Sequence, residues 1–289
     1  MSALAAAKSP YEGAVDFHYT QEDFQALSDL VYADAGIVMP EGKAMLIYSR
    51  LTKFLRERGV STFAEYVRLL NTDADERRRT INALTTNHTK FFRENHHFEH
   101  FAHDVRPVLV RRALGGGRVR MWSAGCSSGE EVYSLTMTLL GDDKTMAQRI
   151  AGSDIALLAS DLADHVIEAG NAATYPANVT EEMPPRLKQN WVVPNGANIT
   201  MSDTVRGLVR FRQLNLLGNW PLKGMFDVIF CRNVMIYFDE PTKAKLLDRL
   251  CAALQPGGYL YIGHSERLVG PAVEHCEPVG PTIYRKHRA

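Results

Sequence analysis

The sequence predicts an α/β protein with a doubly wound, mainly parallel sheet, an all-helical N-terminal domain and a small antiparallel β insertion. From Arg118 onward, mostly apolar strands alternate with helices, which is typical of a parallel sheet. Before about residue 85 the apolar residues recur only with a helical period. Between about 175 and 212, short β-like runs joined by turn residues break the alternation, which indicates the insertion.

The composition excludes several classes of protein. The chain has 289 residues, of which 45% are hydrophobic and 23% charged, as in ordinary globular proteins. Its 33 Lys and Arg residues balance its 33 Asp and Glu residues, which argues against a general nucleic-acid binder. Neither a membrane-spanning run nor a signal peptide is evident, so we expect a cytoplasmic protein without membrane insertion. The cysteines form no CxxC pair, and we expect neither a zinc site nor a disulfide framework.

The helical domain is predicted at 19–85, after an aperiodic segment (1–18) that we expect to be a mobile tail. Thr20 and Asp23 approach the spacing of a capping box and open the first helix. The second helix is predicted at 42–58 and stops at Gly59. A third begins near 61–62, and a fourth covers 74–84.

The second helix has two unlike faces. Its apolar residues share one face by helical spacing, namely Ile47, Leu51, Phe54 and Leu55. Basic residues follow the opposite side, namely Arg50, Lys53 and Arg56. This basic side is either a solvated face or a docking face for an acidic protein surface.

We assign 86–105 to a linker that contributes to the functional site, and 106–289 to the α/β domain. Its strands are predicted at 119–123, 156–160, 209–211, 227–231 and 259–262, and its helices at 130–140, 164–170 and 241–254. Within the insertion we predict a helix at 181–189 and β-like runs at 191–193, 199–201 and 208–211. Asn195-Gly196 and Arg206-Gly207 supply its turns. Leu254 to Gly258 reads as a helix stop and turn before the last strand.

The loop after the first strand, 124–129, is rich in small residues, which lets a ligand approach the backbone. Glu130 and Glu131 then open the helix, where they repel a pyrophosphate but suit a cationic ligand such as S-adenosylmethionine (SAM). The alternative is that they only favour the helix N-terminus.

Polar residues follow two further strands. Asp161 ends the second strand, where an acid can bind ribose hydroxyls or cap the next helix. Arg232, Asn233 and Tyr237 follow the strand at 227–231, at the crevice edge of such sheets, although Tyr237 can equally be a core residue. The histidines at 96, 97, 100 and 103 lack the partners of a metal site, and we interpret them as a polar helix face.

Four blocks occur here in the order typical of one family. They read Asn-His-Thr-Lys-Phe-Phe-Arg-Glu (87–94), Trp-Ser-Ala-Gly-Cys-Ser-Ser-Gly-Glu-Glu (122–131), Ala-Ser-Asp (159–161) and Cys-Arg-Asn-Val-Met-Ile-Tyr-Phe (231–238). Together with Gly-His-Ser-Glu (263–266), they resemble CheR, the chemotaxis receptor glutamate methyltransferases. The resemblance covers about 20–286 and implies a SAM-dependent methyltransferase sheet of the Rossmann-like type. Gly125 and Val132 stand where the family usually has alanine and proline.

The resemblance also implies site residues. SAM contacts are implied for Asn87, Thr89, Arg93, Glu131, Asp161, Asn215, Leu216, Arg232 and Asn233. Among these, Glu131 resembles the acid that holds the cofactor and Asp161 the acid that binds the ribose. Arg93 and Tyr237 resemble the residues nearest the transferred methyl group, and are therefore the candidate catalytic residues.

The implied reaction transfers a methyl group from SAM to receptor glutamates, giving γ-methyl esters and S-adenosylhomocysteine without a metal. The implied partner is the cytoplasmic helical region of chemoreceptors, docked on Arg50, Lys53 and Arg56. Some family members also bind a receptor C-terminal peptide at the insertion, and the sequence leaves this open. We expect a monomer. Alternatives are a methyltransferase with another substrate and a non-catalytic SAM-binding adaptor, whereas the missing GxGxxG motif disfavours an NAD enzyme.

Overall fold

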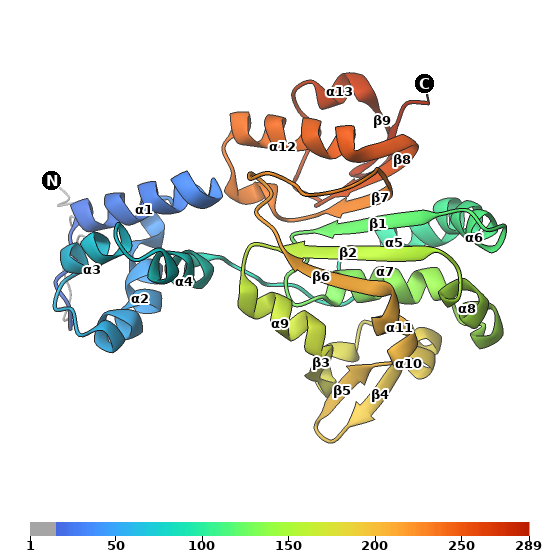
Figure 1. Cartoon of the computed structure of the whole chain (residues 1–289), viewed down its shortest axis with the longest axis horizontal. Helices are drawn as coiled ribbons and strands as arrows, with labels where there is room; N and C mark the ends of the chain where they lie inside the picture. Colours follow the sequence, from blue (N-terminus) through green and yellow to red (C-terminus); the bar gives the residue numbers. More distant parts are fainter. Residues whose placement is uncertain (1–15, 289) are drawn as a thin grey trace, which may run out of the picture. The chain divides into compact units, whose positions relative to one another are not determined.

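The computed structural model describes residues 16–288 (Figure 1). The chain divides into two compact units. Of the described residues, 16–86 together with Tyr237–Asp239 form one unit, and Asn87–Ile236 together with 240–288 form the other. Of the predicted tail, residues 1–15 lie outside the described part. Residues 16–18 contact the helical unit, because His18 forms a β-bridge with Thr62 and the Phe17 N–H donates to the Tyr48 hydroxyl.

The helical unit contains α1 (Gln21–Ala35), the 3-10 turn η1 (Glu41–Lys43), α2 (Ala44–Arg58), α3 (Phe63–Leu70) and α4 (Ala74–Leu84). Capping boxes at Thr20 and Thr62 start α1 and α3, and left-handed glycines end α1 and α2. The predicted second helix therefore forms, but its first residues are the 3-10 turn. The apolar face of α2 is fully buried at Ile47, Leu51 and Leu55, as the helical spacing predicts.

The larger unit is built on a seven-stranded sheet within the described residues, in the order β6-β2-β1-β7-β8-β10-β9 (Figure 1). The strands are β1 (Val119–Ala124), β2 (Ile155–Asp161), β6 (Val209–Gln213), β7 (Phe226–Cys231), β8 (Leu254–Ile262), β9 (Cys276–Gly280) and β10 (Ile283–Lys286). The first five run parallel, which confirms the predicted fold class, and β10 runs antiparallel to β8 and β9. The strand order reverses between β1 and β7, so the crevice of such sheets lies at the carboxyl ends of these strands.

One sequence-based assignment in this unit was wrong, and β9 and β10 had no assignment. Leu254 to Gly258 belongs to β8 rather than to a turn, with an irregular register where the strand begins beside Phe226. Gly258 is required there, because an added Cβ would lie 2.9 Å from the Gln255 carbonyl oxygen and 3.0 Å from that of Asp227.

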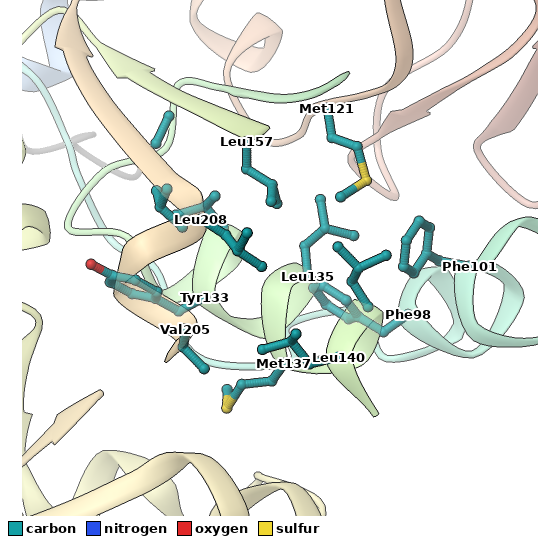
Figure 2. Close-up of a cluster of buried hydrophobic side chains, with 14 of the residues drawn as sticks. Phe98, Phe101, Met121, Tyr133, Leu135, Met137, Leu140, Leu157, Val205 and Leu208 are labelled. Carbon is teal, nitrogen blue, oxygen red and sulfur yellow. The ribbon is translucent and has the colours of Figure 1, made fainter. Parts of the chain in front are cut away.

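Helices pack on the sheet around one hydrophobic core. They are α5 (His96–His100), the π-helical turn η2 (Phe101–Val105), α6 (Arg106–Leu114), α7 (Glu130–Leu140), α8 (Lys144–Ala151), α9 (Asp164–Ala172), α12 (Glu240–Ala253) and α13 (Ala272–His275). Every residue of α7 is buried. Figure 2 shows its side chain Leu135 beside those of Met121 from β1 and Leu157 from β2. This packing fixes the start of α7, and with it Glu130 and Glu131, against the sheet.

The insertion is a three-stranded antiparallel sheet, in the order β3-β5-β4. It contains β3 (Thr174–Pro176), the 3-10 turn η3 (Ala177–Thr180), α10 (Pro185–Trp191), β4 (Val192–Asn195), β5 (Asn198–Met201) and α11 (Asp203–Leu208). The turn at Asn195-Gly196 is confirmed. Three details of the predicted insertion were wrong. The helix predicted at 181–189 starts at Pro185, because prolines suit only the first turn of a helix. Arg206-Gly207 lies inside α11, and the run at 208–211 overlaps β6 of the main sheet.

Candidate functional site

The loop between β1 and α7 is held in a tight left-handed path. Gly125, Ser127 and Gly129 have φ of 79°, 49° and 98°. The N–H groups of Gly125 and Cys126 both donate to the Ser160 carbonyl at the end of β2. A Cβ on Gly125 would lie 2.3 Å from Cγ2 of Val234. A larger residue at position 125 would therefore clash with Val234 in this chain.

Asp161 is buried at the carboxyl end of β2 and ties three segments together. Its Oδ2 accepts from the Ser127 N–H at 2.9 Å, and its Oδ1 accepts from the Ala163 N–H at 3.1 Å. Its carbonyl accepts from the Leu214 N–H after β6. Burial raises the pKa of Asp161, and the hydrogen bonds from these backbone N–H groups oppose that rise. The acid therefore lies at the crevice edge and binds the N–H of Ala163, the residue before α9, while α9 itself has no side-chain cap.

Glu131 and Arg232 form a buried ion pair beside this loop. Arg232 Nε lies 2.8 Å from Glu131 Oε2, and the Ser123 hydroxyl donates to Glu131 Oε1 at 2.6 Å. The Arg232 side chain is only 2% exposed. Its guanidinium is therefore committed to protein partners, and it orients Glu131 at the carboxyl ends of β1 and β7.

Glu94 forms hydrogen bonds with one residue that follows β7 and one that follows β8. Its Oε1 accepts from Asn233 Nδ2 at 3.2 Å and from His264 Nδ1 at 2.9 Å. Burial raises the pKa of Glu94, but the hydrogen bond from His264 and the charge of Arg232 outweigh it and leave the pKa below its ordinary value. Glu94 and Asn233 both have positive φ, of 57° and 59°. Strained backbone of this kind persists where surrounding contacts hold it, often at functional sites.

Glu266 provides a second anchor for the same segment. Its carboxylate accepts from the backbone N–H groups of Gly263, Asn233 and Met235. Sequence reasoning assigned no role to Glu94, Glu266 or His264. The only signal was that they stand within the quoted blocks at 87–94 and 263–266.

The interpretation of the four histidines as a polar helix face was wrong for His97 and His100, whereas His103 is exposed. His97 is fully buried, and its Nδ1 lies 2.8 Å from Arg232 Nη1. His100 Nδ1 lies 2.8 Å from the Tyr261 hydroxyl. Both rings therefore face the sheet, because apolar neighbours on α5 and η2 carry that side of the helix into the core. No group of metal-binding residues occurs in the part of the chain that the structure describes.

The remaining predicted cofactor residues lie on the same loops. Ser127 Oγ donates to the Asn87 carbonyl at 2.7 Å, which brings the first block to the loop after β1. Thr89 is half-buried. Beyond β6, Asn215 Oδ1 accepts from the Leu217 N–H at 2.9 Å, and Leu216 is buried.

Arg93 and Tyr237, the predicted catalytic residues, differ in their surroundings. Arg93 is half-buried, and its Nη1 donates to the His88 carbonyl at 3.1 Å. Within residues 16–288 no carboxylate forms an ion pair with Arg93, so its guanidinium can meet an anionic substrate. Tyr237 belongs to the helical unit, where Lys43 Nζ lies 5.2 Å from its ring centre. Its catalytic role stays a prediction.

The three predicted docking residues also differ. Arg50 Nη1 donates to the carbonyls of Ala83, Leu84 and Thr85 at the end of α4. Lys53 is exposed, and Arg56 is exposed and paired with Asp16. Arg50 is therefore a structural tie between α2 and α4, and the exposed positive charge of this face comes from Lys53 and Arg56.

The charge at the crevice fits SAM. Glu130, Glu131 and Asp161 are buried there, and Glu94 Oε2 is buried without a hydrogen-bond partner among the described atoms. A sulfonium and an ammonium group suit such a carboxylate-rich site, whereas a pyrophosphate does not.

No helix of the described residues is long and apolar enough to cross a membrane.

Comparisons with known proteins agree with this geometry. Residues 87–284 match the family model "CheR methyltransferase, SAM binding domain", and residues 22–85 match "CheR methyltransferase, all-alpha domain". A probable chemotaxis protein methyltransferase of Rhizobium etli is 44% identical, over 89% of this chain and 96% of that protein. Chemotaxis protein methyltransferase 2 of Pseudomonas aeruginosa is 42% identical, over 96% and 97%. The chemotaxis protein methyltransferase of Escherichia coli is 38% identical, over 84% and 83%.

Two adjacent family models thus cover most of the chain, and the buried acids and their partners lie at the crevice of the SAM-binding domain. The chain belongs to the CheR methyltransferase family.

Proposed function

We propose that this protein transfers a methyl group from SAM to glutamate side-chain carboxylates of chemoreceptors, forming γ-methyl esters and S-adenosylhomocysteine. The reaction serves sensory adaptation in the cytoplasm, and the protein acts as a monomer. The observation that carries the proposal is the acidic crevice at the carboxyl ends of β2, β1 and β7, where Asp161 and the Glu131–Arg232 pair are buried. The match to chemotaxis methyltransferases along nearly the whole chain supports the substrate.

Asp161 would bind the ribose hydroxyls, and Glu131 would hold the cofactor against the loop after β1. Asn87 and Thr89 would contact the cofactor from the first block, and Asn215 and Leu216 from the end of β6. Asn233 is held by Glu94 and Glu266, so its backbone and side chain meet the ligand in one orientation. The bound cofactor supplies an electrophilic methyl group on a sulfonium.

The acceptor needs no general base. A glutamate with an ordinary pKa of about 4.3 is already ionised at neutral pH. The enzyme must instead align the carboxylate oxygen with the methyl carbon and sulfur, and exclude water. Arg93 would hold the carboxylate with two hydrogen bonds, leaving one oxygen lone pair directed at the methyl group. Tyr237 would donate a hydrogen bond to the substrate.

The receptor's helical region would dock on Lys53 and Arg56 of α2. Whether the β insertion also binds a receptor C-terminal peptide stays a prediction of the resemblance. Its support is topological, because β3 and β4 are the edges of the small sheet and can accept a further strand.

Reversing the charge of both docking residues, Lys53→Glu with Arg56→Glu, is expected to raise the KM for receptor about tenfold at low salt. The reason is that exposed charges steer and hold an acidic partner. The difference should shrink as salt is added. The measurement is receptor methylation against receptor concentration, with SAM binding followed separately by calorimetry.

The matched control is Arg78→Glu, another exposed arginine of the helical unit, on α4. Arg50 is left unchanged because its loss would free the carbonyls that end α4. An unchanged KM in the double variant would remove the docking face from the proposal.

The reaction itself is tested by incubating the protein and radiolabelled SAM with membranes that contain chemoreceptors. We expect label in the receptor band and its release as methanol by alkali, because carboxyl esters are base-labile. Label that survives alkali would mean a nitrogen acceptor and another substrate class. Tight SAM binding with no transfer to any receptor would favour the non-catalytic adaptor.

A further inference from the structure

The hydrogen bonds around His97 determine its protonation. Arg232 can only donate, so at 2.8 Å the His97 Nδ1 must accept. The proton of the neutral ring then lies on Nε2, which is 2.9 Å from the Thr282 hydroxyl oxygen and donates to it. The Thr282 hydroxyl in turn donates to the Pro281 carbonyl at 2.8 Å. Each donor in this chain therefore meets an acceptor, and the Pro281 backbone is a further hydrogen-bond partner of His97.

We propose that His97 is a positioning residue for the cofactor site. As a neutral acceptor it fixes the Arg232 guanidinium, and through it the Glu131 carboxylate, while the turn between β9 and β10 holds the imidazole in the required tautomer. The inference rests on the cofactor-binding role proposed for Glu131. It gives the hairpin of β9 and β10 a place in SAM binding.

The surroundings of His97 favour this neutral state. The ring is fully buried, with Phe230 and Tyr261 edge-on at centroid distances of 6.4 and 5.5 Å. Burial, followed by the charges of Arg232 and His96, lowers the pKa of His97 to about 3, although Glu94 opposes this. A protonated ring would lose its acceptor and place a second positive charge beside Arg232.

Backbone contacts hold the turn between β9 and β10 in one conformation. Thr282 has φ of 56°, a left-handed conformation that is rare for a β-branched residue. The Thr282 carbonyl accepts from the Ile262 N–H at the end of β8, which attaches the turn to the sheet. The threonine hydroxyl is thereby held where the Nε2 proton points.

Arg232 needs the His97 Nδ1 acceptor because few other hydrogen-bond acceptors lie near its guanidinium. Its Nε binds Glu131, whereas Glu94 Oε2 lies 3.9 Å from Nη1, beyond hydrogen-bond distance. Without the His97 acceptor, Nη1 gains a partner only by moving toward Glu94. That movement would rotate the guanidinium and pull Nε away from Glu131.

The test compares His97→Met, which fills the space without an acceptor, with His97→Gln, whose amide can both accept from Arg232 and donate to Thr282. The SAM dissociation constant of the full chain is measured by calorimetry, alongside KM and kcat. We expect His97→Met to weaken SAM about tenfold or more, as loss of a hydrogen bond to a charged group implies. His97→Gln should stay within about threefold of the wild type. In His97→Met, KM for SAM should change more than kcat at saturating SAM.

The matched control is His100→Met, a half-buried histidine in the same helix whose Nδ1 meets Tyr261 instead of Arg232. It should leave SAM affinity unchanged. Wild-type affinity in His97→Met, an equal loss in folded His97→Gln, or an equal loss in His100→Met would each overturn the proposal. SAM binding needs no receptor, so a protein that binds SAM but methylates nothing would contradict the proposed function and leave this inference standing.

Two further measurements keep the inference open to refutation if His97→Met does not fold. Thr282→Val removes the hydroxyl that accepts the Nε2 proton and should weaken SAM about threefold, whereas unchanged affinity would overturn the role of the Thr282 hydroxyl. Nitrogen NMR of the imidazole rings should show one neutral Nε2–H tautomer that persists at pH 6 and disappears in His97→Gln. A protonated ring or the Nδ1–H tautomer at that pH would contradict the assignment.

Discussion

Arg93→Ala is expected to lower kcat for receptor methylation by about a hundredfold. Removing a charged hydrogen-bond donor typically costs about 1.5–3 kcal/mol, and 2.7 kcal/mol corresponds to about a hundredfold in rate. Arg93 is half-buried, and within residues 16–288 its side chain forms its hydrogen bond to a backbone carbonyl and no ion pair. The change should therefore leave the fold intact and act on the substrate carboxylate. Initial rates at saturating SAM and receptor measure the effect.

Arg93→Lys is the matched control for charge. It keeps the positive charge but loses the planar fork, so we expect a rate between those of the wild type and Arg93→Ala. Thermal unfolding should show that both variants are folded, and SAM calorimetry measures separately any loss of the SAM contact that the resemblance implies for Arg93. Full turnover by Arg93→Ala would remove this residue from the role assigned to it.

Arg232→Met is expected to have the largest effect on stability. The change leaves Glu131 buried with only the Ser123 hydroxyl, and breaking a buried ion pair typically costs about 3–5 kcal/mol. The free energy of unfolding, measured with urea, should fall by about that amount. SAM binding should be lost as well, because the Glu131 carboxylate is then free to turn.

The double variant Arg232→Met with Glu131→Gln separates these two effects. It removes the uncompensated charge and should recover at least about 1 kcal/mol of stability relative to Arg232→Met. SAM binding should stay lost, since the carboxylate is gone. A double variant that binds SAM like the wild type would mean that the pair is only structural.

Local signals in the sequence account for the predictions that succeeded. The capping boxes at Thr20 and Thr62 set helix starts through hydrogen bonds only three residues apart. The apolar strands β1, β2 and β7 follow from burial alone. The placement of Asp161 at the crevice follows because the residue after a parallel strand must lie at its carboxyl edge.

What sequence reasoning missed depends on partners distant in the chain. Arg50 resembles an exposed docking residue until α4 brings three carbonyls to its guanidinium. His97 reads as part of a polar helix face, and only the packing of α5 against the sheet reveals Arg232 as its partner. No helical or strand periodicity encodes such pairings, which are separated by more than thirty residues.

The most direct test of the central claim is tandem mass spectrometry of receptor peptides after reaction with this protein and SAM. The account predicts one added methyl group on a glutamate side chain in the receptor's helical region, lost on brief alkaline treatment. A methyl group located on lysine, arginine or a backbone nitrogen, and stable to alkali, would contradict it.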